Sequence, residues 1–270
     1  MKIGFVQFDP AFGEVEKNLS KVASLIEGVE ADLLVLPELF NTGYLFTSKQ
    51  EVIDLAEEIP DGRTPKALLA MAKEKGVHLV AGMAEWDDGR IHNSAVLVSP
   101  RGHVGTYRKI HLFYEEKLWF DPGDREPEVF DIGLCRVGVM VCFDWFFPET
   151  TRILALRGAD IVCHSANLVL PYCQDAMITR CLENRVFAVT SNRTGSEQRG
   201  GKTLAYTGRS QIVNPRGNVL CRAERETDEV RVVDVDVTAA RDKQLNEHNN
   251  LFSDRRPQFY GALIQKPQGG

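Results

Sequence analysis

Hydrophobic and polar residues form segments of two kinds along this chain. Short apolar or alternating runs such as KIGFVQF and DLLVLP are typical of β-strands, and DLLVLP is apolar enough for a strand covered on both faces. Between such runs, apolar residues recur every three or four positions, as at Leu19, Val22 and Ile26, which predicts amphipathic helices. Strands are expected over 2–8, 32–37, 77–83, 93–99, 103–108, 135–143, 160–164 and 187–192, with more in 209–237. Helices are expected over 17–29, 50–59, 65–75, 148–157, 172–185 and 238–245.

The alternation of strands and helices predicts a layered α/β domain with helices outside and sheets inside. About ten or more strands are expected, which is many for one flat sheet. The pattern therefore favours two packed sheets between helices. No linker rich in Pro, Gly or Ser divides the chain, so residues 1–270 are expected to form a single domain.

Composition and charge limit the partners that this chain could have. The formal net charge is −6 and the Lys and Arg residues are scattered, which argues against binding nucleic acid. No apolar stretch approaches the ~20 residues of a membrane helix. The first residues, MKIGFVQFDP, alternate like a strand rather than forming the apolar region of a signal peptide. We expect a protein of the cytoplasm that binds neither nucleic acid nor membranes.

The cysteines and histidines show no metal-ligand spacing. Six cysteines are spaced irregularly in a chain without a secretion signal, so reduced thiols are expected rather than a disulfide framework. CxxC, HxH and HExxH patterns are absent from the sequence. A zinc site is therefore not expected.

Three candidate functional residues stand where predicted strands end. Glu38 follows DLLVLP, Lys109 follows HVGTYR, and Cys142 ends CRVGVMVC. Functional groups of α/β proteins gather just beyond strand ends, where the backbone is rigid and loops leave room for a ligand. Each residue alone also has an ordinary interpretation, as a loop charge, a surface cation or a small buried hydrophobe.

The three residue types are compatible with a thiol nucleophile. A free thiol has a pKa of about 8.5, so a nearby carboxylate such as Glu38 could accept its proton during attack. Lys109 could stabilise the thiolate and then the negative charge of a tetrahedral intermediate. The main-chain N–H of Phe143, just after Cys142, could supply a second donor to that charge.

In their order and surroundings these segments resemble the nitrilase (carbon–nitrogen hydrolase) superfamily. The resemblance rests on LPELF, YRKIHLF and GVMVCFDWFFPE, and on NSAVLVSPRG, LRGADIV, CLENRVFAVTSNR and GRSQIVNPRG, and it extends to about residue 259. It implies a four-layer α-β-β-α sandwich and a catalytic triad of Glu38 as base, Lys109 as stabiliser and Cys142 as nucleophile. Members often carry a second glutamate soon after the lysine. Glu115 and Glu116 are the candidates here, and we favour Glu116 from its placement before WFDPGD.

The resemblance also implies a reaction and an assembly. Members form a covalent thioester through the cysteine, release ammonia or an amine, and hydrolyse the thioester with water, without a metal or an organic cofactor. They commonly form homodimers or higher homo-oligomers. The C-terminal tail, about residues 246–270, mixes aromatic and charged residues and is expected to contribute to dimer contacts. The alternative for this tail is a solvated terminus.

Four further residues are candidates for contacts with a small-molecule substrate. Tyr44 and Asn167 fall on loops expected to border the pocket. Phe143 and Trp145 follow the nucleophile and could shape a small apolar site. Core packing is the alternative role for Trp145.

Two departures from the family pattern leave the substrate open. The nitrile-preferring branch commonly has Trp-Glu-Asn after its cysteine, whereas this chain has Phe143-Asp144-Trp145. Many amidase-like members have an Arg four residues after the cysteine, where this chain has Phe146. We expect hydrolysis of a small, uncharged or weakly polar nitrile or amide. The alternatives are an N-carbamoyl amidohydrolase and a catalytically inert binding or scaffold relative, although such a relative should have lost one of the three residues.

Overall fold

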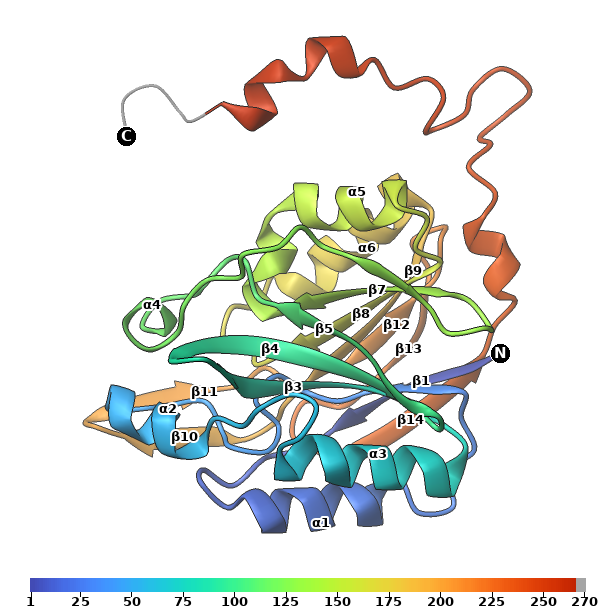
Figure 1. The fold of residues 1–270 in the computed structure, drawn as a ribbon. Coiled ribbons are helices and arrows are strands. Elements are labelled where there is room, and N and C mark those ends of the chain that lie inside the picture. Colours follow the sequence, from blue (N-terminus) through green and yellow to red (C-terminus); the bar gives the residue numbers. More distant parts are fainter. Residues whose placement is uncertain (266–270) are drawn as a thin grey trace.

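Two six-stranded sheets form the centre of the molecule (Figure 1). The computed structural model describes residues 1–265. The first sheet has the order β14-β1-β2-β3-β4-β5, with β1 Lys2–Gln7, β2 Leu33–Val35, β3 His78–Asp87, β4 Arg90–Ser99, β5 Gly102–Arg108 and β14 Glu229–Asp234. The second has the order β13-β12-β9-β8-β7-β6, with β6 Val129–Asp131, β7 Arg136–Val141, β8 Ile161–Ala166, β9 Phe187–Asn192, β12 Gln211–Val213 and β13 Val219–Arg222.

Helices cover the outer face of each sheet, and the inner faces pack on each other. In Figure 1, α1 (Val15–Leu25) and α3 (Arg63–Lys75) lie below the first sheet, and α5 (Pro148–Leu156) and α6 (Cys173–Asn184) lie above the second. Ile3 and Phe5 of one sheet belong to the same buried cluster as Val137 and Val139 of the other. The predicted four-layer α-β-β-α sandwich is therefore confirmed.

The direction of the strands brings the predicted site residues to one edge. β2 pairs parallel with β3, and β3, β4 and β5 pair antiparallel in turn, so β5 runs in the direction of β2. Glu38 and Lys109 therefore leave the first sheet at the same edge. β7 and β8 pair parallel in the second sheet, so Cys142 and Asn167 also leave it at one edge.

Smaller elements differ from the prediction. The hairpin of β10 (Ser196–Arg199) and β11 (Lys202–Ala205), the strand β6 and the short helix α4 (Glu116–Trp119) were not predicted. The helix expected over 50–59 forms as α2 (Lys49–Leu55), which begins one residue earlier and ends four residues before the expected end. The helix expected over 238–245 was wrong, because only a 3-10 turn, Val237–Ala240, forms there. The ammonium of Lys243 binds the main-chain oxygens of Asn184, Arg185 and Ala240, which turns the chain toward the end of α6 instead of continuing a helix.

The C-terminal segment leaves the compact body after this turn. Figure 1 shows it running upward past α5 and then beyond it. Phe259, Leu263 and Ile264 are largely exposed on it. The last part of the predicted dimer tail, residues 266–270, lies outside the described residues.

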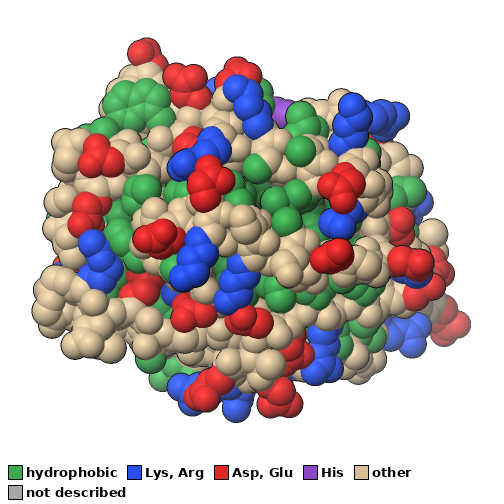
Figure 2. Space-filling view, turned by 90° about the horizontal axis from the view of Figure 1, so that it is seen from below, with side chains coloured by type: hydrophobic (Ala, Val, Ile, Leu, Met, Phe, Trp, Pro, Cys, Tyr) green, Lys and Arg blue, Asp and Glu red, His purple; other side chains and the backbone are tan. Residues whose placement is uncertain are grey.

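One face of the molecule and the length of the helices can be compared with the expectations from the sequence. The face beneath α1 and α3, shown in Figure 2, carries basic and acidic side chains interspersed with one another. Within residues 1–265, no helix combines the length and the apolar character needed to cross a bilayer. The cytoplasmic location stays a prediction.

Candidate active site

Glu38 lies in a fully buried loop directly after β2. Its Oε1 accepts hydrogen bonds from Asn93 Nδ2 and from Lys109 Nζ, both at 2.7 Å. Its Oε2 is buried and has no hydrogen-bond partner within the described residues. An unpartnered buried carboxylate oxygen is costly, and it is free to accept a proton.

Lys109 is held between two carboxylates. Its ammonium lies 2.7 Å from Glu38 Oε1 and 2.8 Å from Glu116 Oε1, and all three side chains are almost fully buried. The hydroxyl of Tyr44 donates to the same Glu116 oxygen at 2.6 Å. The main-chain N–H of Phe113 donates to Glu116 Oε2 at 3.2 Å. This arrangement fixes the cation, and among the described residues it leaves Glu38 Oε2 without a hydrogen bond.

Burial and neighbouring charges have opposing effects on the pKa values of Lys109 and Glu116. Burial disfavours the charged form of Lys109, but the Glu116 and Glu38 carboxylates outweigh it and raise the pKa of Lys109, so the lysine stays an ammonium. Burial raises the pKa of Glu116 to about 7, against the attraction of Lys109, with the Glu38 charge adding to the rise. Glu116 can therefore gain or lose a proton near neutral pH.

Cys142 lies on a sharp turn between β7 and the 3-10 segment Cys142–Phe146. Its φ of 42° falls in the left-handed region, which non-glycine residues rarely adopt. Strained backbone of this kind persists only when its surroundings enforce it, and it is concentrated at functional sites. The Asp144 carboxylate enforces it here, by accepting from Val141 N at 2.9 Å and from the Tyr107 hydroxyl at 2.8 Å.

The thiol of Cys142 is protonated at rest. Burial raises its pKa well above the ordinary value, and the Glu38 charge raises it further, while Lys109 lowers it. A thiolate must therefore form during attack, with a carboxylate available to take the proton. The small cleft beside Cys142 has a volume of about 10 Å³, room for about one water molecule. Its lining consists of Phe113, Cys142, Phe143, Trp145, Asn167, Leu168, Val169 and Leu170.

The structure brings together most of the predicted site residues. Phe143, Trp145 and Asn167 line the cleft, and the Asn167 amide donates to the main-chain oxygen of Glu38 at 2.8 Å. Tyr44 does not line this cleft, because its hydroxyl is turned onto Glu116.

Two residues adjacent in sequence to the predicted ones, Glu115 and Phe146, lie outside the site. Glu115 pairs with Lys202 of the β10–β11 hairpin, so Glu116 is the glutamate that contacts Lys109. Phe146, at the position where many amidase-like members carry an Arg, is half exposed and does not line the cleft.

Sequence reasoning missed three residues that support the site: Asn93, Asp144 and His164. Asn93 contacts Glu38 directly, and Asp144 and His164 hold the turn around Cys142. A signal was available for two of them. A polar Asn opening NSAVLVS and a His inside IVCHSA interrupt runs that are otherwise apolar or small.

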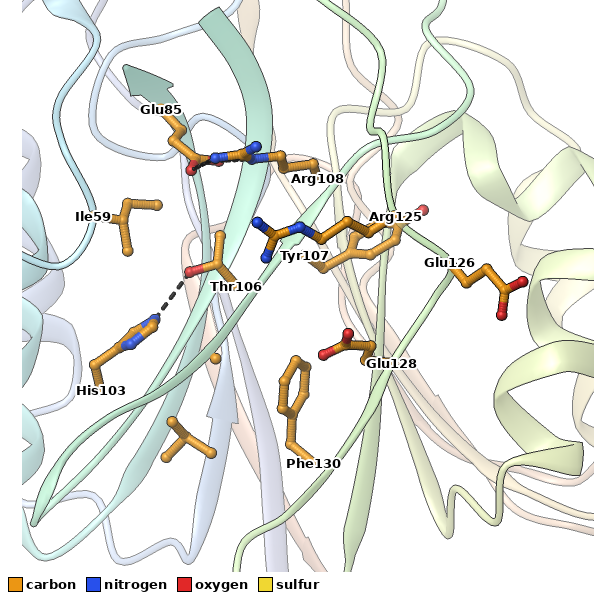
Figure 3. Close-up of a pocket in the computed structure, with 12 residues that line it drawn as sticks. Ile59, Glu85, His103, Thr106, Tyr107, Arg108, Arg125, Glu126, Glu128 and Phe130 are labelled. Carbon is orange, nitrogen blue, oxygen red and sulfur yellow. Dashed lines mark hydrogen bonds and ion pairs between the residues drawn. The ribbon is translucent and has the colours of Figure 1, made fainter. Parts of the chain in front are cut away.

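A larger cavity of about 340 Å³ lies elsewhere, between β5 and residues 125–130 (Figure 3). Charged side chains line it from both walls, with Arg108 on β5 and Arg125 and Glu128 on the opposite wall, where Phe130 also lies. Glu38, Lys109, Glu116 and Cys142 are not among its lining residues. We therefore assign the chemistry to the small cleft and not to the larger cavity.

Comparison with known proteins identifies what this chain is similar to. The profile of the family described as "Carbon-nitrogen hydrolase" matches residues 2–244. A protein named nitrilase from Pyrococcus abyssi is 49% identical over 96% of this chain and 99% of its own length. An (R)-stereoselective amidase from a Pseudomonas species is 37% identical over 100% of this chain and 96% of its own length.

A solved structure of a similar protein reports chemistry at a cysteine. It is a mutant of the amidase from Nesterenkonia sp. AN1, 25% identical, with a TM-score of 0.80 over 98% of this chain and 100% of that one. In that protein, acrylamide has undergone Michael addition at the active-site cysteine.

Proposed function

The chain belongs to the carbon–nitrogen hydrolase family, and we propose that it hydrolyses a small, uncharged nitrile or amide through a thioester on Cys142. The proposal rests chiefly on one observation. Lys109 is fixed between the buried carboxylates of Glu38 and Glu116, and the charges of all three act on the Cys142 thiol. An ordinary buried cysteine has no such surroundings.

In the first half-reaction, Cys142 Sγ attacks the carbonyl carbon of an amide while Glu38 accepts the thiol proton. The oxygen of the resulting tetrahedral intermediate carries negative charge, which the Lys109 ammonium stabilises. The carbon–nitrogen bond then breaks. The proton on Glu38 passes to the departing nitrogen, ammonia leaves, and a thioester remains on Cys142.

In the second half-reaction, the oxygen of a water molecule attacks the thioester carbon while Glu38 accepts a proton from that water. The carbon–sulfur bond breaks, Cys142 recovers a proton, and a carboxylic acid leaves. A nitrile takes one more water. Attack on its carbon gives a thioimidate, hydration of the thioimidate releases ammonia, and the same thioester follows.

The lining of the cleft supports a small, neutral substrate. Within residues 1–265, the lining of this cleft consists of aromatic and aliphatic side chains, the Cys142 thiol and the Asn167 amide, and it includes no charged side chain. Burying a substrate charge there without a partner would be unfavourable. The small free volume favours a short acyl group.

An ammonia-release assay tests this proposal. Propionitrile and butyronitrile, or their matching amides, should release ammonia, and a substrate carrying a carboxylate should react at least ten times more slowly. Cys142→Ala should abolish turnover, and mass spectrometry of the quenched wild type should find the acyl group on the Cys142 peptide. No ammonia from any neutral substrate would overturn the proposal, and carbon dioxide released with ammonia from N-carbamoyl compounds would indicate the carbamoyl branch.

We also propose that two copies of the chain form a homodimer through α5, α6 and the C-terminal segment. Leu156 of α5 and Leu182 of α6 are 40% and 47% exposed, and Phe259 and Leu263 of the segment are about two-thirds exposed. Large apolar side chains left exposed on these elements favour burial against a partner. Sedimentation velocity should find a dimer for the full chain and a monomer after deletion of residues 246–270. A full-length monomer would contradict the proposal.

A further inference from the structure

A buried carboxylate on the β10–β11 hairpin holds the loop that carries Tyr44. Glu197 of β10 is 6% exposed and accepts hydrogen bonds from the main-chain N–H groups of Tyr44 at 3.1 Å and Leu45 at 2.5 Å. Gly43 precedes them with a φ of +79°, and a Cβ on it would lie 2.9 Å from Glu197 Oε1. The loop can approach the carboxylate this closely because this residue has no side chain.

The carboxylate is itself fixed by a fully buried cation. Arg193 is 0% exposed and donates to Glu197, to Asp9 Oδ1 at 2.5 Å and to the main-chain oxygen of Pro10 at 3.2 Å. Its guanidinium also lies 4.0 Å from the ring centre of Tyr206. A buried Arg–carboxylate pair with this many contacts has little freedom to move.

Tyr44 connects Glu197 to the active site. Its hydroxyl donates at 2.6 Å to Glu116 Oε1, the oxygen that also accepts from Lys109. We propose that Glu197 is a positioning residue for the hydrolysis, which sets Glu116 through the Tyr44 hydroxyl. The inference rests on the proposed function, since it assigns Glu197 a part in that reaction.

The physical effect is on the charge state of Glu116. A donor hydrogen bond favours the carboxylate over the carboxylic acid, so the Tyr44 hydroxyl lowers a pKa that burial raises. If Glu197 releases the loop, the hydroxyl moves away and Glu116 holds its proton to higher pH. The apparent pKa that Glu116 gives to the pH–rate profile then moves to higher pH, whether the reaction needs the carboxylate or the carboxylic acid.

A double-mutant cycle tests this coupling, with propionamide or propionitrile as substrate, whichever the wild type hydrolyses. Glu197→Gln should lower kcat/KM at least tenfold and move the pH limb up by about half a unit or more. Tyr44→Phe, which removes only the hydroxyl, should do the same. In the Tyr44→Phe background, Glu197→Gln should lower kcat/KM less than threefold further, because the path it uses is already broken.

The hairpin offers a matched control. Arg199 of the same hairpin binds Glu51 of α2 at 2.8 Å and the main-chain oxygen of Leu45 at 2.9 Å, and Glu51 also accepts from Thr47 N. This pair therefore anchors the same loop without contacting the Tyr44 amide. Glu51→Gln should therefore weaken the anchoring of the hairpin but leave the pH limb in place. If Glu197→Gln does not fold, Glu197→Asp keeps the charge beside Arg193 and withdraws the carboxylate from the loop by one methylene, with the same expected shift.

The outcomes separate this inference from the proposed function. Full additivity of Glu197→Gln and Tyr44→Phe, or an unmoved pH limb, would show that Glu197 only supports the fold. If the wild type hydrolyses neither substrate, the proposed function fails. The rate of Cys142 alkylation by iodoacetamide is then followed against pH in place of turnover. The inflection due to Glu116 ionisation should move to higher pH in both single variants and no further in the double variant.

Discussion

The Nε2 of His164 lies 3.0 Å from the main-chain oxygen of Cys142. A carbonyl oxygen can only accept, so Nε2 carries the proton and Nδ1 accepts from the Thr190 hydroxyl at 3.2 Å. His164 is fully buried, and burial lowers its pKa to about 4. A neutral imidazole thus ties β8 to the turn that carries the nucleophile.

This buried imidazole predicts a loss of stability in acid. Unfolded His164 takes up a proton near its ordinary pKa of about 6.5, whereas the folded protein resists protonation down to about pH 4. The unfolding free energy therefore falls as pH drops through that window. Between pH 7 and 4.5, urea unfolding should show wild type losing about 2 kcal/mol more than His164→Gln, which keeps a donor for the carbonyl. Equal losses would contradict the assignment of a neutral buried His164.

Glu38→Gln should separate structure from proton transfer. The amide oxygen of Gln can still accept from Asn93 and Lys109, but the side chain cannot take the thiol proton. We expect kcat to fall by about 10²–10⁴-fold with little change in the circular dichroism spectrum. Steady-state ammonia release measures the change. Activity within tenfold of wild type would assign the base elsewhere.

Gly82→Ala should damage the site through the backbone. A Cβ at Gly82 of β3 would lie 2.5 Å from Glu38 Cα and 3.0 Å from Leu39 N, both in a packed loop with nowhere to move. We expect a loss of about 1–3 kcal/mol in stability and a clear fall in kcat, because Glu38 is displaced. Gly261→Ala is the control, since among the described residues a Cβ there meets nothing within 4 Å. Thermal unfolding and turnover of the two variants provide the comparison.

Asp144→Asn should weaken the turn at Cys142 without altering a reacting group. One carboxylate oxygen accepts from Val141 N and the other from His111 N, so either orientation of the new amide places its NH₂ against a main-chain donor. The unfolding free energy should fall by about 1–3 kcal/mol. Tyr107→Phe removes one donor and leaves the main-chain bonds, so its cost should be smaller. A variant as stable as wild type would show that Asp144 does not enforce the turn.

The sequence predicted the features that depend on local pattern. Strands of six or more residues have a clear apolar period, and Glu38, Lys109 and Cys142 stood at strand ends. The strand directions bring Glu38 and Lys109 to one edge of the first sheet. The β10–β11 hairpin, SEQRGGKTLA, is too short and polar to show a strand period. The contacts of Glu197 with Tyr44 span 153 positions, and no local pattern reports such a distance.

Some distinctions could not be drawn from the sequence for physical reasons. Glu115 and Glu116 differ by one position, and only the turn of α4 decides which side chain meets Lys109 and which meets Lys202. The helix expected over 238–245 failed because Lys243 binds carbonyl groups at the end of α6, a tertiary contact that overrides local propensity.

The proposed base and nucleophile come from different sheets. Glu38 leaves the first sheet, Cys142 leaves the second, and Asn167 of the second joins them by donating to the main-chain oxygen of Glu38. If Glu38 and Cys142 act as proposed, neither half of the sandwich can react alone. A newly made chain then becomes active only after the two sheets have packed on each other in the correct position. Activity therefore reports that folding is complete. A displacement of one sheet relative to the other should abolish activity while the helices and strands remain folded. On heating, ammonia release should therefore be lost at a lower temperature than the circular dichroism signal of the helices.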